Sequence, residues 1–202
     1  MAGEASGEVQ LWASRSQFED IFTLVAVGDL EGVKEVVEKD QEKLKAIEGE
    51  DGAKPLHWAV RHNREDMVKR LMELGANVEV SDKDGETPLL YACRDGHASM
   101  VRLLVDKFGA NMAVTGLDGQ TGLHRVADRG REGALEALIS LGAEINARDA
   151  KGKTPLHLAS AKAKGKTYLS NSQLIFCLYH SRQVLWSLSN SFLILETKTI
   201  KN

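Results

Sequence analysis

A ten-residue stretch recurs at an interval of 33 or 34 residues, and this periodicity restricts the fold more than any other feature. It reads DGAKPLHWAV from Asp51, DGETPLLYAC from Asp84, DGQTGLHRVA from Asp118 and KGKTPLHLAS from Lys151. A fixed period of about 20–50 residues is typical of proteins built from stacked structural repeats. We therefore expect a repeat array rather than a single globular core.

Each repeat contains signals for two short helices joined by tight turns. In the repeat that begins at Asp84, the glycine of the DG pair can adopt the positive φ of a turn. Thr87 then suits a helix N-cap, and Pro88 suits the first helical position. A second helix is expected over about residues 97–107, ended by Gly109. This repeat has one residue more than its neighbours, which we place near residues 107–109.

The apolar positions of the second helices recur with the same period. The equivalent sets are Val68, Val101 and Leu135; Leu71, Leu104 and Leu138; and Met72, Val105 and Ile139. Helices this short are unstable alone in water, so each pair must bury its apolar face against the neighbouring pairs.

The turn, the TPLH-like tetrapeptide, the two helices and the closing GAN or GAE resemble the ankyrin repeat over about residues 18–162. This resemblance implies an all-α solenoid of stacked helix–turn–helix repeats with hairpin turns. The predicted divisions are a disordered segment 1–17, a degenerate capping repeat 18–50, repeat 1 at 51–83, repeat 2 at 84–117, repeat 3 at 118–150, a truncated repeat 4 at 151–162 and a non-repeat tail 163–202.

Three positions depart from the ankyrin pattern. Lys54 stands where the family favours Thr, Leu90 where it favours His, and Gly122 where it favours Pro. Each departure is expected to remove part of a capping network, at a cost on the order of 1 kcal/mol. We therefore expect a modestly stable array.

The tail differs from the repeats in composition, because residues 163–202 contain one acid and five bases. Three interpretations stay open: a membrane span within 174–195, a helix over about 174–188 that covers the open end of the stack, or an alternative coding segment without a selected fold. An uncovered end would expose apolar surface and favour association through that end; otherwise a monomer is expected.

No motif indicates catalysis, a cofactor or a metal. His57, His124 and His157 recur at one repeat position, where the resemblance implies a local structural hydrogen bond. The two GKT tripeptides lack the glycine that a P-loop needs five residues earlier, and the two cysteines lack zinc-ligand spacing. We expect no enzyme activity, no cofactor and no metal site.

Composition narrows the partners and the compartment. The net charge of −3 gives no support for binding nucleic acid or an anionic membrane. The N-terminal residues lack the apolar core of a signal peptide, which favours the cytosol or the nucleus.

Residues that vary while their surroundings repeat are the candidates for contact with a partner protein. In ankyrin-like proteins, the turns and first helices line a concave surface. The predicted partner-facing residues are Glu50, Asp51, Arg61, His62, Lys83, Asp84, Glu86, Arg94, Asp95, Asp118, Gln120, Asp128 and Arg129. A separate stripe is formed by Trp58, Tyr91, Arg125 and Leu158, which either pack between first helices or anchor a partner.

These features predict a non-catalytic protein-interaction module that acts as an adaptor, a scaffold or a stoichiometric inhibitor. One alternative is a truncated regulatory region of a larger enzyme or channel polypeptide, and another is a membrane-attached adaptor that uses the tail. Asn146 lies in a loose match to the asparagine-hydroxylation context of some ankyrin repeats. A mapped mass gain of one oxygen at Asn146 would be required to establish that modification.

Overall fold

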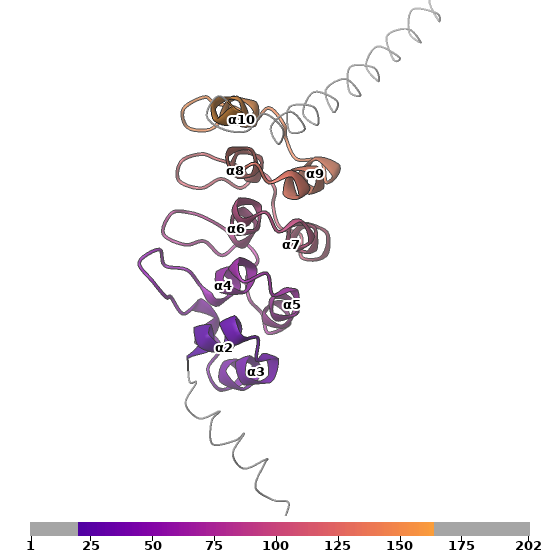
Figure 1. The fold of residues 1–202 in the computed structure, drawn as a ribbon. Coiled ribbons are helices and arrows are strands. Elements are labelled where there is room, and N and C mark those ends of the chain that lie inside the picture. The colour runs from indigo at the N-terminus through magenta and orange to yellow at the C-terminus, as the bar shows by residue number, and fades with distance from the viewer. Residues whose placement is uncertain (1–19, 164–202) are drawn as a thin grey trace, which may run out of the picture.

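The computed structural model describes residues 20–163, with side chains through residue 161, as a stack of helix pairs (Figure 1). The first helices form one layer: α2 (Ile21–Val27), α4 (Pro55–Arg61), α6 (Pro88–Asp95), α8 (Gly122–Arg129) and α10 (Pro155–Ala163). The second helices form the other: α3 (Leu30–Lys39), α5 (Glu65–Glu73), α7 (Ala98–Arg102) and α9 (Glu132–Ser140). Within these residues there is no strand, and the predicted all-α solenoid is confirmed.

The first helices pack against one another in chain order, so that α4 contacts α2 and α6, and α8 contacts α6 and α10. Backbone hydrogen bonds also join the tips of successive turns. Lys83 N–H donates to the carbonyl of Asp51 at 2.9 Å, and Leu117 N–H donates to that of Asp84 at 2.9 Å. Each turn is therefore held in register by the next, and the loops project together from one side of the stack (Figure 1).

The helix pair α2 and α3 occupies the place of the predicted capping repeat. Its helices begin at aspartates: Asp20 accepts a hydrogen bond from Phe22 N–H at 3.4 Å, and Asp29 accepts one from Gly32 N–H at 3.0 Å. A 3₁₀ turn, η1 (Gln41–Lys45), follows α3. The apolar faces of α2 and α3 join the common core, while charged side chains occupy the outer face of α3.

The extra residue of repeat 2 is accommodated inside its second helix. After α7 the chain forms a π turn, η2 (Leu103–Lys107). Ala110 N–H donates to the carbonyl of Leu104, six residues earlier, whereas Ala143 donates to Leu138, only five residues earlier. The insertion therefore lies between Leu104 and Ala110, as a widened helical turn that spans the predicted position.

The C-terminal end of the described stack exposes apolar surface. Leu156 on α10 is 43% exposed, whereas Leu56, Leu89 and Leu123 at the same repeat position are each 2% exposed. The equivalent leucines are covered by a neighbouring pair, and α10 has no second helix behind it within the described residues. The predictions for residues 1–17 and for the tail beyond Ala163 lie outside those residues. No helix from 20 to 163 is long and apolar enough to cross a membrane.

Candidate protein-binding surface

The residues predicted to face a partner lie on the turns and at the ends of the first helices. The exposed ones are Glu50, Arg61, His62, Lys83, Asp84, Asp118 and Arg129. The half-buried ones are Asp51, Arg94, Asp95, Gln120 and Asp128. We call this set, without Glu86, the turn surface. Many of its charges are already paired: Arg61 binds Asp51 at 3.2 Å, and Arg94 binds Asp95 at 3.5 Å.

Glu86 lies beneath the turn surface rather than on it. Its side chain is 6% exposed and lies between two arginines, Arg94 and Arg125, whose side chains are 24% and 21% exposed. Arg94 Nη1 is 3.2 Å from Glu86 Oε2, and Arg125 Nη2 contacts Oε1. Burial raises the pKa of the Glu86 carboxyl, and the two guanidinium groups oppose that shift. The prediction that Glu86 faces a partner is therefore wrong, because its carboxylate is enclosed by its own chain.

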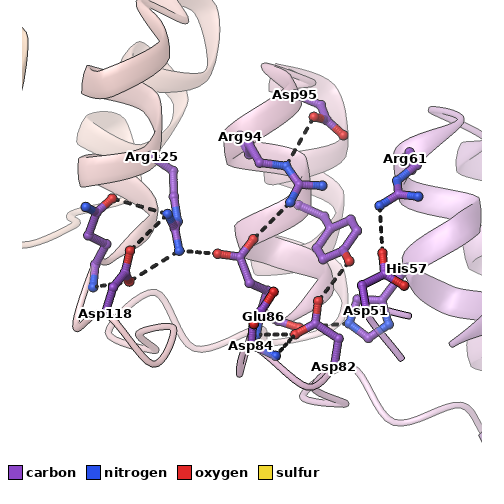
Figure 2. A network of polar contacts seen from close by, with 12 residues as sticks. Asp51, His57, Arg61, Asp82, Asp84, Glu86, Arg94, Asp95, Asp118 and Arg125 are labelled. Atoms are coloured by element: carbon purple, nitrogen blue, oxygen red, sulfur yellow. Dashed lines mark hydrogen bonds and ion pairs between the residues drawn. The ribbon is translucent and has the colours of Figure 1, made fainter. Parts of the chain in front are cut away.

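Arg125 reaches Glu86 because Gly116, in the turn before α8, has no side chain to block it. Gly116 stands where the turns directly before and after it have Asp82 and Asp149, and a Cβ at Gly116 would lie 3.1 Å from Arg125 Nη2. Arg125 also binds Asp118 Oδ2 at 3.1 Å. Its guanidinium group therefore links two successive turns (Figure 2).

Tyr91 occupies the same repeat position as Arg125, one repeat earlier. Its hydroxyl donates to Asp82 Oδ2 at 2.8 Å, and burial raises the pKa of that hydroxyl. The guanidinium carbons of Arg61 and Arg94 lie 5.2 and 4.2 Å from the centre of its ring. Tyr91 is buried, and Trp58 packs edge-on against Phe22 with ring centres 5.8 Å apart. The two aromatic members of the predicted stripe thus pack between first helices.

The recurring histidines tie each helix start to the following turn. In repeat 1, His57 Nδ1 accepts from Lys54 N–H at 3.1 Å, while Nε2 lies 2.9 Å from the carbonyl oxygen of Glu86. His124 repeats both contacts, with Thr121 N–H and the Lys153 carbonyl. An Nδ1 that accepts a backbone N–H leaves the proton on Nε2, which donates to the carbonyl. Burial lowers the pKa of His57 to about 4, so the ring is neutral at physiological pH.

Leu90 cannot make these contacts in repeat 2. In repeat 3 the hydroxyl of Thr121 lies 2.9 Å from His124 Nδ1. The equivalent hydroxyl in repeat 2, that of Thr87, is buried and has no hydrogen-bond partner among the described residues. The sequence departure at Leu90 therefore leaves an unsatisfied hydroxyl where repeats 3 and 4 have a bond between threonine and histidine.

The turn surface carries acidic, basic and amide side chains that are exposed or half-buried. Among the described residues, no three His, Cys, Asp or Glu side chains are placed to hold a metal ion. Asn146 is exposed and lines a groove beside the loops. Its hydroxylation stays a prediction.

Sequence reasoning missed the Glu86–Arg125 link. The signal for it was an arginine at a position where repeats 1 and 2 have an aromatic residue, together with Gly116.

Comparison with known proteins agrees with this architecture. A family model described as ankyrin repeats in three copies matches residues 21–115, and one described as ankyrin repeats in many copies matches residues 123–166.

Individual relatives match part of this chain. The chain is 32% identical over 154 residues to the E3 ubiquitin-protein ligase KEG of Arabidopsis thaliana, covering 71% of this chain and 9% of the ligase. It is 36% identical over 110 residues to neurogenic locus notch homolog protein 1 of Homo sapiens, covering 54% and 4%. It is 38% identical over 100 residues to NF-kappa-B inhibitor alpha of Sus scrofa, covering 47% and 32%. The chain thus spans a third or less of each relative, and its repeats, helix pairs and family matches show that it belongs to the ankyrin repeat family.

Proposed function

We propose that this chain is a non-catalytic module that binds another protein through the turn surface, as an adaptor, a scaffold or a stoichiometric inhibitor in the cytosol or nucleus. The network that runs from Asp51 through Arg61, Tyr91, Arg94, Glu86 and Arg125 to Asp118 carries this proposal. It fixes the side chains of three successive turns before any partner arrives. A preformed surface lowers the ordering cost of binding, which favours recognition.

The family membership supports the same proposal, because ankyrin repeats generally serve as protein-interaction modules.

A second candidate is a regulatory region of a larger polypeptide. The small share of the ligase that this chain covers, 9%, favours that candidate. A transcript that continues repeat 4 in frame would establish it. The membrane-attached adaptor depends on the tail, and requires carbonate-resistant membrane pelleting that disappears when the chain ends at residue 162.

The experiment compares partners captured by the full chain with those captured by a variant of the turn surface. The variant carries Glu50→Lys, Asp84→Lys and Arg129→Glu, which alter exposed side chains and leave the Glu86 cluster intact. A matched control carries Glu35→Lys, Glu136→Lys and Lys39→Glu, which make the same charge changes on exposed positions of α3 and α9.

Affinity capture followed by mass spectrometry is the readout, after circular dichroism has shown equal helicity. We expect one or more partners to be lost from the turn-surface variant and retained by the control. Identical partner sets for both variants would contradict binding through the turn surface.

A further inference from the structure

A groove of about 670 Å³ lies between two successive loop segments, residues 111–115 and residues 142–148. Buried Thr121, Leu123 and Leu138 also line it, and we call it the loop groove. Its size falls within the range of sites that bind small ligands. No residue of the turn surface lines the loop groove, so the two are separate.

One repeat earlier, a carboxylate of the chain itself bridges the corresponding two loops. Glu79 Oε1 accepts a hydrogen bond of 2.7 Å from the backbone N–H of Asn111. In the repeat register, Ala113 takes the place of Glu79, and Glu144 takes the place of Asn111. Ala113 has no acceptor to offer, and no acceptor for the Glu144 N–H occurs among the described residues. Ala113 and Glu144 both line the loop groove.

The other groups in the groove fit a carboxylate carried on a short apolar chain. Arg148 contributes a positive charge, and its Nη1 donates to the carbonyl of Gly152 at 3.1 Å. The carboxylate of Glu144 is the opposing negative charge, and it is exposed to solvent. Met112 and Ala143 are half-buried and line the groove, so they provide accessible apolar surface for methylene groups.

We propose that the loop groove binds a glutamate side chain from an extended acidic segment of a partner protein. The glutamate carboxylate accepts from Glu144 N–H, as Glu79 accepts from Asn111 N–H one repeat earlier. Its two methylenes lie against Met112 and Ala143, and Arg148 adds attraction at the rim. A hydrogen bond to a charged acceptor is roughly twice as strong as a neutral one, so an acidic side chain is favoured over its amide.

The test is a titration of the full-length, ¹⁵N-labelled chain with the blocked tripeptide acetyl-Val-Glu-Val-amide, followed by NMR. We expect a saturable downfield shift of the Glu144 amide proton. The same peptide with glutamine in place of glutamate should bind about tenfold more weakly. Equal affinities, an unshifted Glu144 amide or no saturation at millimolar peptide would each overturn the proposal.

Two variants test whether a missing acceptor defines the site. Ala113→Glu supplies the carboxylate from within the chain, and should weaken peptide binding at least about tenfold at unchanged helicity. Glu79→Ala removes the natural bridge one repeat earlier, and should add a peptide-dependent shift at the Asn111 amide. Unchanged affinity in the first variant, or an unshifted Asn111 amide in the second, would overturn the inference.

Discussion

The junction between repeats 1 and 2 and the junction between repeats 2 and 3 are joined by different chemistry. At the first junction, neutral His57 lies 2.9 Å from the carbonyl oxygen of Glu86. At the second, Leu90 occupies the histidine position, and the side chain of Glu86 pairs with Arg125 across the junction. The backbone of Glu86 thus serves the first junction and its side chain serves the second.

This difference shows how a repeat protein loses a family residue without losing the stack. Leu90 removes the hydrogen bond between the histidine and the carbonyl of the next turn. That bond joins uncharged groups, so it does not depend on salt, and it forms only at close distance. The Glu86–Arg125 pair restores contact between the turns through charge, with both side chains largely shielded from water. The stability of the first junction should therefore depend on pH. The stability of the second should depend on the presence of both charged partners.

Removal of the Glu86 carboxylate should produce the largest effect and separate the two junctions. Glu86→Ala leaves Arg94 and Arg125 partly buried without their shared anion, so we expect a loss of about 3 kcal/mol in the free energy of unfolding. Urea denaturation followed by circular dichroism measures this loss.

The matching control is Arg125→Leu, which introduces the residue found at this position in repeat 4. The double variant should lose clearly less than the sum of the two single variants, because the charges no longer stand alone. Strict additivity would show that the pair does not join the junction.

The first junction should weaken as the pH falls. The pKa of His57 is about 4 in the folded chain and about 6.5 when unfolded, so the unfolded state binds a proton that the folded state does not. Stability from this residue is complete above pH 6.5 and is lost as the pH falls toward 4. We expect a loss of about 2 kcal/mol between pH 7.5 and pH 5.

Urea denaturation at several pH values measures this dependence. The comparison with His57→Leu isolates the contribution of His57 from that of the carboxylates, since the variant should have a shallower slope between pH 5 and 7. Parallel pH profiles for the two proteins would contradict the assignment.

Restoration of the family proline at the second junction should destabilise the chain. A Cβ at Gly122 would lie 2.8 Å from Cys93 Sγ, so the absence of a side chain allows α8 to lie close to α6. Gly122→Pro should cost about 1.5 kcal/mol despite the favourable φ of proline at a helix start. Thermal denaturation checks this, and a second change, Cys93→Ala, should recover most of the loss. A more stable Gly122→Pro single variant would show that the close approach is unnecessary.

The smallest expected effect is a gain from converting the second junction to the chemistry of the first. Leu90→His offers Nδ1 to the unsatisfied Thr87 hydroxyl and Nε2 to the carbonyl of Gln120, so we expect about 1 kcal/mol of stabilisation. Adding Thr87→Val should remove much of the gain, whereas Thr87→Val alone should be nearly neutral. Both are measured by urea denaturation, and destabilisation by Leu90→His would count against the equivalence of the junctions.

The sequence predicted the stack because its signals are local and periodic. Thr87, Pro88 and Gly96 mark the start and end of α6 within ten residues of one another, and the structure confirms that helix. The missing bond at Leu90 was also predictable, since the family pattern names the residue that is absent. Both predictions rest on short-range chemistry that every repeat shares.

The candidate surface was harder to predict because variation has two causes. Glu86 varies between repeats as a partner-facing residue would, yet its carboxylate is buried against Arg125 of the next repeat. A pairing between positions 39 residues apart, which also requires Gly116 to have no side chain, cannot be read from one repeat alone. The placement of the turn surface followed from the family architecture. The ion pairs beneath it could be identified only from the three-dimensional structure.

The Glu86–Arg125 link also gives the repeats a fixed order. A tandem duplication of repeat 3 would place a second copy of Arg125 behind Gln120, the residue that repeat 3 has at the Glu86 position. That arginine would be largely buried without an anion, so the lengthened chain would be destabilised at the new junction. Insertion between repeats 1 and 2 would instead need only a histidine on the first helix and a carbonyl on the next turn, and every turn provides the carbonyl. Growth of this protein by duplication is therefore easier on one side of repeat 2 than on the other.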